Sequence, residues 1–249
     1  HRDVVITEAG RVFVQEARLL IKKMQATRRQ CQQVANGWRG QLSIAVDRIV
    51  RADRTRQLVL DFYREFPDME LLISPEVFNG VWDALADGRV DAAIGATRAV
   101  PVGGGYRFRD MGFMPWHCVV SRGHPLAQQA GPLTDDQLRP YPALCQEDTS
   151  RSLPKRDTWT LDNQRRLVVP DWTSALDCLL AGLCVGMIPA HMAQPLIDRG
   201  DLTVLTLHQP FPDSACCLTW AQEKSSPALV WLLDYLGESD TLNREWLRG

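Results

Sequence analysis

The pattern of apolar and polar positions predicts a long helix at the start of the chain. Thr7 is a suitable N-cap, and Gly37 is a suitable C-terminal stop. Mostly apolar or small side chains recur between them at alternating steps of four and three: Phe13, Ala17, Leu20, Met24, Thr27, Cys31 and Val34. This heptad seam keeps one stripe facing a partner helix, so we expect residues 7–37 to form a linker helix that dimerises. The alternative is an amphipathic helix that packs on its own domain.

The period of the pattern changes after residue 40. Residues 41–47 alternate like a strand, 54–66 are helical, 69–77 form a strand, 81–87 form a helix, and 91–96 form a short apolar strand. This β-α-β-α-β order predicts a parallel sheet with helices on both faces.

A second group of elements follows the Pro- and Gly-rich residues 101–105 (PVGGG). Strands are predicted at 116–121, 143–146, 167–170, 185–188, 202–207 and 215–221, and helices at 134–138, 174–181, 190–198 and from Ser226-Pro227 onward. Two α/β lobes joined by crossing strands enclose a cleft, where small ligands usually bind. We assign residues 40–98 and 214–249 to lobe I and residues 99–213 to lobe II.

Composition narrows the class of protein. The 249 residues are 45% hydrophobic and 23% charged, which is ordinary for a globular protein and excludes a disordered chain. No apolar stretch approaches the roughly 20 residues of a membrane span, so we expect no membrane partner. The seven cysteines are an odd number and show no CxxC or Cys/His spacing, so we expect a cytoplasmic protein with no metal site and no cofactor.

The charge is divided unevenly along the chain. Residues 1–40 carry a net charge of +5 and the remainder −7. A basic arm on an acidic body is typical of nucleic-acid contact near one end, although a basic solvated helix face gives the same pattern.

Five motifs carry a family resemblance, and their order and spacing matter more than any one of them. They are TEAG (7–10), GQLSI (40–44), GRVDAAIG (88–95), HPLA (124–127) and AGLCVGMIP (181–189). With these motifs the chain resembles the LysR family of bacterial transcription regulators over its whole length. The resemblance implies an α/β fold of two Rossmann-like lobes, similar to type 2 periplasmic binding proteins, behind a linker helix.

The resemblance also implies a function and partners. Such a regulator binds double-stranded DNA through a winged helix-turn-helix, which would precede this chain and is largely absent from it. Residues 1–6 would be the end of the wing, with Arg2 as a phosphate contact. The family implies a homodimer through the linker helix and a homotetramer through the effector domains, and RNA polymerase is a further candidate partner.

Two blocks, GVWDAL (80–85) and EDTSR (147–151), resemble a subgroup of enterobacterial regulators of purine-nucleoside and allantoin-pathway genes. The subgroup resemblance implies a purine nucleoside or a related catabolite as the effector.

The candidate effector-binding residues lie at strand ends, where loops border the expected cleft. They are Asp47, Arg48, Ile49, Phe78, Asn79, Ala96, Thr97, Glu147, Asp148, Thr149, Ser150, Asp171, Trp172 and Thr173. An Asn side chain offers both donor and acceptor to a base edge, and a Trp can stack on a flat ring. The alternatives are an exposed turn at 47–49, a solvated loop at 147–150 and a core position for Trp172.

Two other classes of protein share some of these features. A transporter's solute-binding protein shares the two-lobed cleft, but it has no need of a basic helix with a heptad seam. An enzyme is disfavoured because His117, His124, His191 and His208 lie beside no recognisable nucleophile motif. The triple glycine at 103–105 also lacks the Lys-Ser/Thr tail of a phosphate loop. We therefore expect a regulator with no catalytic residues.

Overall fold

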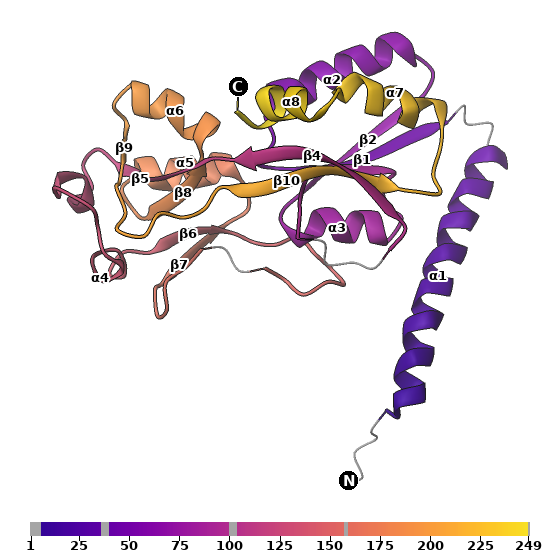
Figure 1. Ribbon diagram of the computed structural model, residues 1–249, viewed down its shortest axis with the longest axis horizontal. Coiled ribbons are helices and arrows are strands. Elements are labelled where there is room, and N and C mark those ends of the chain that lie inside the picture. Colours follow the sequence, from indigo (N-terminus) through magenta and orange to yellow (C-terminus); the bar gives the residue numbers. More distant parts are fainter. Residues whose placement is uncertain (1–5, 36–39, 100–103, 157–158, 249) are drawn as a thin grey trace.

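The computed structural model describes the chain except for residues 1–5, 36–39, 100–103, 157–158 and 249. Two five-stranded sheets lie side by side, and a long helix stands away from them (Figure 1). The predicted class, two α/β lobes behind a linker helix, is confirmed.

The first sheet has the order β2-β1-β3-β10-β4. Its strands are β1 (Gln41–Asp47), β2 (Glu70–Glu76), β3 (Ala92–Thr97), β4 (Tyr106–Met114) and β10 (Ser214–Ala221). Strand β1 runs parallel to both β2 and β3, as the β-α-β-α-β pattern predicted. Strand β10 fills the space between β3 and β4 and is antiparallel to both.

Helices cover both faces of this sheet (Figure 1). They are α2 (Ala52–Glu65), α7 (Pro227–Leu236) and α8 (Ser239–Leu242) on one face and α3 (Asn79–Ala86) on the other, and a π-helical turn (Asn243–Arg248) follows α8. The core under α2 and α7 contains Phe62, Leu232 and Trp246, and Trp82 fills the core under α3. The Ser226 hydroxyl accepts the Leu229 N–H at 3.1 Å, which confirms the predicted start of α7.

The second sheet has the order β7-β6-β8-β5-β9. Its strands are β5 (Trp116–Ser121), β6 (Ala143–Gln146), β7 (Arg166–Val169), β8 (Val185–Pro189) and β9 (Leu202–Val204). Its helices are α4 (Asp135–Leu138), α5 (Trp172–Leu180) and α6 (Ala190–Asp198), with a 3-10 turn at Pro125–Gln128. The core under α5 and α6 gathers apolar side chains such as Leu179 and Ile188.

Strand β4 was not predicted, and the lobe boundary at residue 99 is wrong for this stretch. Residues 106–114 pair with β10 in the first sheet, and only Pro115 separates them from β5 in the second sheet. Strand β4 lies at the edge of its sheet, where Phe108 is 60% and Phe113 47% exposed. Apolar and polar residues therefore do not alternate regularly along this segment, and the sequence pattern did not indicate a strand.

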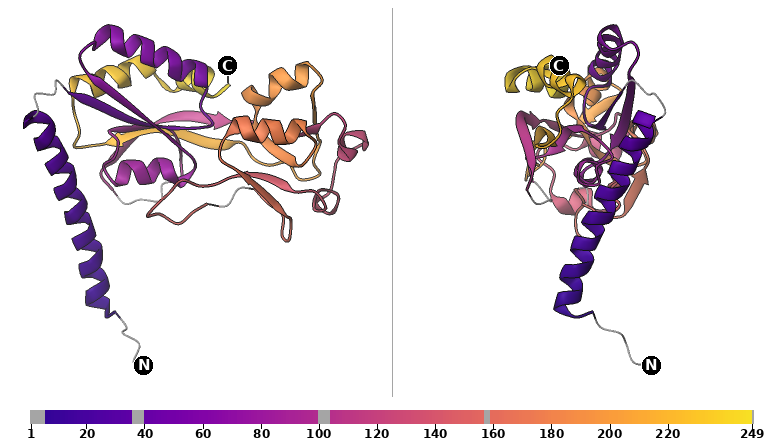
Figure 2. Two further views of the ribbon diagram at one scale, coloured as in Figure 1. Left: turned by 180° about the vertical axis from the view of Figure 1, so that it is seen from behind. Right: turned by 90° about the vertical axis from the view of Figure 1, so that its right-hand side faces the viewer.

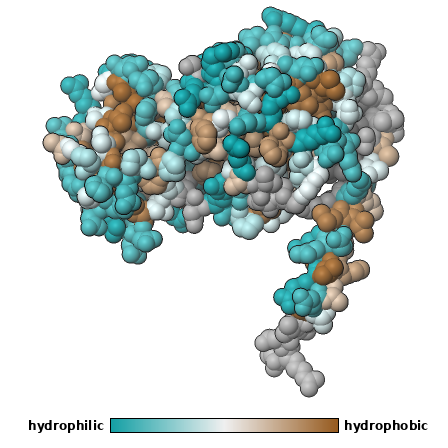
Figure 3. Space-filling model, in the orientation of Figure 1, coloured by the Kyte–Doolittle hydropathy of each residue, from teal (hydrophilic) through white to brown (hydrophobic). Residues whose placement is uncertain are grey.

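Helix α1 (Glu8–Ala35) projects from the first lobe (Figures 1 and 2). The Thr7 hydroxyl accepts the Gly10 N–H at 3.1 Å, so Thr7 caps the helix as predicted. Phe13, Leu20 and Met24 of the heptad seam are 73%, 69% and 66% exposed, and apolar patches are visible along the helix in Figure 3.

Three residues that the sequence analysis singled out in this region cannot be compared with the structure. Arg2 and Gly37 lie outside the described residues, as does the side chain of Val34. Among the described helices, none combines the length and the apolar character that crossing a membrane requires.

Candidate functional site

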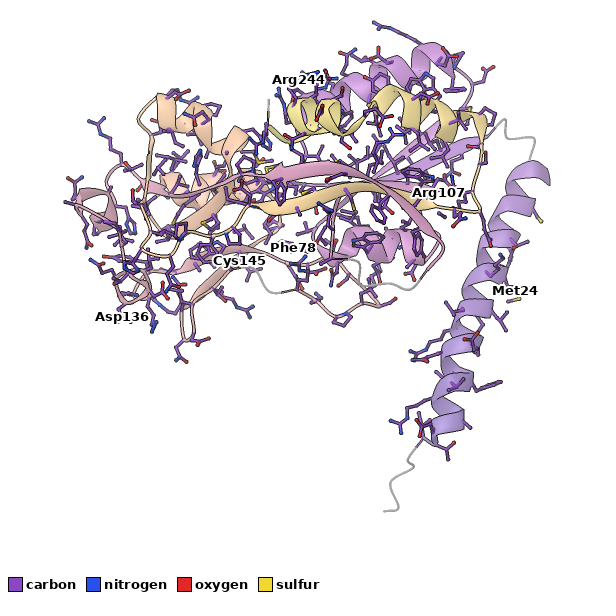
Figure 4. All side chains as sticks on the ribbon, viewed as in Figure 1. Met24, Phe78, Arg107, Asp136, Cys145 and Arg244 are labelled. Atoms are coloured by element: carbon purple, nitrogen blue, oxygen red, sulfur yellow. The ribbon has the colours of Figure 1, made fainter. Side chains whose placement is uncertain are left out.

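Two adjoining cavities lie between the lobes, at the carboxyl ends of the parallel strands. One has a volume of about 170 Å³ and the other about 330 Å³. They share a wall of side chains from both lobes: Phe78, Trp116, Gln146, Arg156, Trp172, Pro212 and Ser214. Figure 4 labels Phe78 of the first lobe and Cys145 of the second, which meet at the smaller cavity near the middle of the molecule. A continuous cleft therefore joins the two sheets.

The smaller cavity is walled by aromatic rings. The ring centroids of Trp116 and Trp172 lie 6.2 Å apart at an interplanar angle of 50°, and those of Trp159 and Phe211 lie 5.0 Å apart at 62°. The Trp116 Nε1 donates to the Ser214 hydroxyl at 2.9 Å, which fixes that indole across the lobe boundary. Such walls suit a flat ring, because aromatic faces stack in offset or tilted arrangements.

Three buried donors on this wall lack a partner. Within the described part of the chain, nothing accepts a hydrogen bond from Gln146 Nε2, Trp159 Nε1 or Trp172 Nε1. A buried donor without an acceptor destabilises the folded state by about 1–3 kcal/mol, so such a group normally binds water or a ligand. All three residues line the smaller cavity, and a ligand that carries ring acceptors would satisfy them.

The larger cavity contains a buried carboxyl group. Asp47 ends β1, is only 5% exposed and lines this cavity with Thr97 and Ser214. The pKa of Asp47 is raised to about 7. Burial is the main cause, the backbone N–H groups of Ile49 and Phe78 oppose it, and the carboxyl groups of Asp148 and Glu76 add a smaller increase. The acid is therefore partly protonated at neutral pH.

Two other carboxylates hold the lobes together. Asp148 accepts the backbone N–H groups of Asn79 (3.1 Å), Gly80 (3.2 Å), Ser150 (2.8 Å) and Arg156 (2.8 Å). Asp83 of α3 accepts those of residues 151, 152 and 153 at 3.0–3.1 Å. The loop after β6 is thus clamped to helix α3 of the first lobe, and we call this arrangement the carboxylate clamp.

Gly80 allows the close approach that the clamp requires. A Cβ at this position would lie 1.9 Å from the Thr149 hydroxyl, which itself donates to Glu76 and accepts the Val77 N–H at 2.9 Å. Phe78, directly before α3, has φ 53°, a conformation that bulky residues rarely adopt. This tight turn aims Phe78 at both cavities.

The sequence-predicted candidates separate into two groups. Asp47, Ile49, Phe78, Thr97 and Trp172 line the cavities. The other candidates do not line either cavity, and most have structural contacts instead. The carboxylate clamp or its loop contains Asn79, Asp148, Thr149 and Ser150, and Ala96 is in the core. Glu147 pairs with Lys155, and Arg48 donates to the Pro170 carbonyl. Asp171 caps α5, and Thr173 is exposed.

Some lining residues were missed by sequence reasoning. Gln146 is the last residue of the correctly predicted β6, so the strand-end rule would have found it, whereas Trp116 is the first residue of β5 and lies at this edge because β5 is antiparallel to β8. Trp159, Phe211 and Ser214 come from irregular segments or a strand end far along the chain, where no pattern indicates which way a side chain faces.

A cleft of this form defines a two-lobed domain that binds a small molecule. Comparison with known proteins names the family: residues 35–240 match the model of the LysR substrate binding domain. The chain belongs to the LysR family of transcription regulators. It is 65% identical over 248 residues to the HTH-type transcriptional regulator PunR of Escherichia coli, covering 100% of this chain and 80% of the relative. It is 31% identical over 220 residues to the HTH-type transcriptional activator AllS of Salmonella typhimurium, covering 88% and 71%.

Solved structures share the fold. Full-length LysG of Corynebacterium glutamicum, with bound effector Arg, superposes with a TM-score of 0.61 at 22% identity, covering 98% of this chain and 81% of LysG. The effector-binding domain of QuiR in complex with shikimate superposes with a TM-score of 0.58 at 16% identity, covering 83% and 97%. This chain is thus a LysR-type regulator whose effector domain binds a small molecule, and its relatives are regulators that bind DNA.

Proposed function

We propose that the cleft binds a purine nucleoside or a related catabolite and that this ligand controls transcription of the genes to which the regulator binds. The observation that carries the proposal is the tilted Trp116–Trp172 pair beside three unpartnered donors. A purine offers a flat ring for the indoles and ring nitrogens that accept hydrogen bonds. The resemblance of residues 80–85 and 147–151 to a purine-nucleoside and allantoin-pathway subgroup supports the same ligand class.

Control by this ligand requires two arrangements of the lobes with different affinities. A ligand that touches both lobes favours the arrangement in which both sets of contacts are made. The wall shared by the two cavities, which comes from both lobes, meets that requirement. The matched family also supports a homodimer through α1, a homotetramer through the effector domains, double-stranded DNA and RNA polymerase as partners, and a cytoplasmic location.

The direct test is thermal unfolding of this chain with adenosine, inosine, adenine and allantoin, with arginine and shikimate as comparison ligands. A ligand at about 100 times its Kd stabilises the folded state by roughly 2.7 kcal/mol, which shifts Tm visibly. We expect a shift with a purine and its loss in Trp172→Leu. The control variant is Phe108→Leu, because Phe108 is 60% exposed and lies on β4 away from both cavities.

The proposal would be refuted if no purine shifts Tm while arginine, shikimate or another acid does. A purine shift that survives in Trp172→Leu unchanged would place the ligand outside this cleft. Isothermal titration calorimetry of the same variants separates lost binding from lost stability, because it reports Kd on the folded protein.

A further inference from the structure

The cleft has two compartments of different chemistry. The smaller one, which we call the ring compartment, carries the indoles of Trp159 and Trp172 and the unpartnered Gln146 amide. The larger one carries the buried Asp47 carboxyl and the Thr97 hydroxyl at strand ends of the first sheet, and we call it the polar compartment after these two groups. The two share Phe78, Trp116 and Trp172, so a single ligand can extend from one into the other.

Asp47 differs from the other buried carboxyl groups near it. Glu76 pairs with the Arg89 guanidinium at 2.9 Å, and Asp148 accepts four backbone N–H groups. Asp47 accepts only the backbone N–H groups of Ile49, at 3.0 Å, and Phe78, and in the described part of the chain it forms no ion pair with a lysine or arginine.

Acceptor capacity therefore remains on Asp47. A carboxylate has about four acceptor positions, and two are occupied here. Those that remain lie on a residue that lines the polar compartment. Hydroxyl groups of a ligand can donate to them. An anionic group placed there would face the buried carboxyl group of Asp47, and like charges so close in a buried site repel strongly.

We infer that Asp47 is a specificity-determining residue, which accepts hydrogen bonds from the uncharged, hydroxyl-bearing part of the effector and rejects a phosphorylated one. This inference rests on the proposed function and deepens it: the purine ring occupies the ring compartment and the sugar occupies the polar compartment. The site then distinguishes a nucleoside from its free base and from its nucleotide, although all three carry the same ring.

The exposed Arg156 lies on the wall of both compartments and is the strongest argument for the opposite preference. A guanidinium attracts phosphate. Its position on the exposed surface puts its charge in high dielectric, where attraction is weak and screened by salt. Asp47 is buried, so its charge acts with much less screening, and we expect the buried group to decide the preference.

The test measures Kd by titration calorimetry for adenosine, adenine and adenosine 5′-monophosphate on the wild-type chain at pH 8 and 0.15 M salt. We expect adenosine to bind at least about tenfold more tightly than either of the other two, because adenine lacks the hydroxyl groups and the nucleotide carries the repelled charge. This ligand series needs no variant.

The variant Asp47→Asn then assigns the effect. It keeps the shape of the side chain and removes the charge. Adenosine affinity should fall about tenfold, adenine affinity should stay the same, and the nucleotide should bind more tightly than it does to the wild type. The control is Asp198→Asn, the same exchange at an exposed position on α6 outside both cavities, which should change none of the three constants.

The outcomes separate the two proposals. If purines bind and Asp47→Asn weakens adenine and adenosine equally, or the nucleotide binds the wild type as tightly as the nucleoside, the role of Asp47 is refuted and the purine effector stands. If no purine in the series binds the wild type, the proposed function fails, and the inference fails with it.

Discussion

Asp47 should make the stability of the protein depend on pH, and the size of this dependence follows from its burial. Its pKa is about 7 in the folded protein against 3.8 for an unperturbed aspartate. A raised folded-state pKa contributes stability that is fully present below pH 3.8 and is lost as the pH rises through 7. At about 1.4 kcal/mol for each pKa unit, the loss between pH 5 and pH 8 is on the order of 3 kcal/mol.

The variant Asp47→Asn removes this titration. The difference in free energy of unfolding between the variant and the wild type should therefore move in favour of the variant by on the order of 3 kcal/mol from pH 5 to pH 8. Urea unfolding of both proteins at four pH values measures it, because groups common to both cancel in the difference. A constant offset reflects the altered hydrogen bonds to Ile49 and Phe78. A difference that does not change with pH would show that Asp47 is ionised with an ordinary pKa.

Three further changes test other parts of the structure. Both ring nitrogens of His191 are buried, and burial, with the nearby Arg51 guanidinium, lowers its pKa to about 4, so stability is lost as the pH falls below 6.5. The free energy of unfolding of His191→Leu, relative to that of the wild type, should be higher at pH 5 than at pH 7.5 by on the order of 1 kcal/mol, a figure that allows for partial solvent screening. Urea unfolding at the two pH values measures it. Equal gains at both pH values would contradict this account. Gly80→Ala should cost about 1–3 kcal/mol, because its Cβ would meet the Thr149 hydroxyl at 1.9 Å, whereas Gly123→Ala has nothing within 4 Å of its Cβ and should cost little. Equal Tm values for these two variants would argue against the tight clamp. Leu20→Glu places a charge on the exposed seam of α1 and should shift sedimentation toward a smaller species, and an unchanged sedimentation coefficient would argue against dimerisation through this face.

Much of the fold could be predicted because it depends on local patterns. Residues 41–47, 116–121 and 143–146 are short strands with continuous or alternating apolar side chains, and the structure places strands at these same residues. The parallel arrangement followed from the helices between the early strands. Strand β4 escaped because its edge position leaves Phe108 and Phe113 exposed, and edge strands lack a clear buried face.

The site could be predicted only in part, for a physical reason. Strand ends border the cleft in this type of fold, and Asp47, Phe78 and Thr97 were found by that rule. Asp148 follows the same rule but turns away to accept backbone N–H groups of α3, and nothing in the sequence around it shows that these donors lie nearby. Trp159 reaches the cleft from a loop, so only the tertiary fold determines its position.

The position of β10 between β3 and β4 has a consequence for how the protein is made. Strand β4 ends at Met114 and β10 begins at Ser214, so a ribosome adds about 100 residues before the first sheet can close. At roughly 5–20 residues per second this takes about 5–20 s. During this interval the facing edges of β3 and β4 lack the strand that pairs with both, and open edges recruit other chains. The core of the first lobe also needs Leu232 and Trp246, which are fully buried and are made later still than β10. A nascent chain that stalls within the second lobe should therefore depend on chaperones for its first lobe.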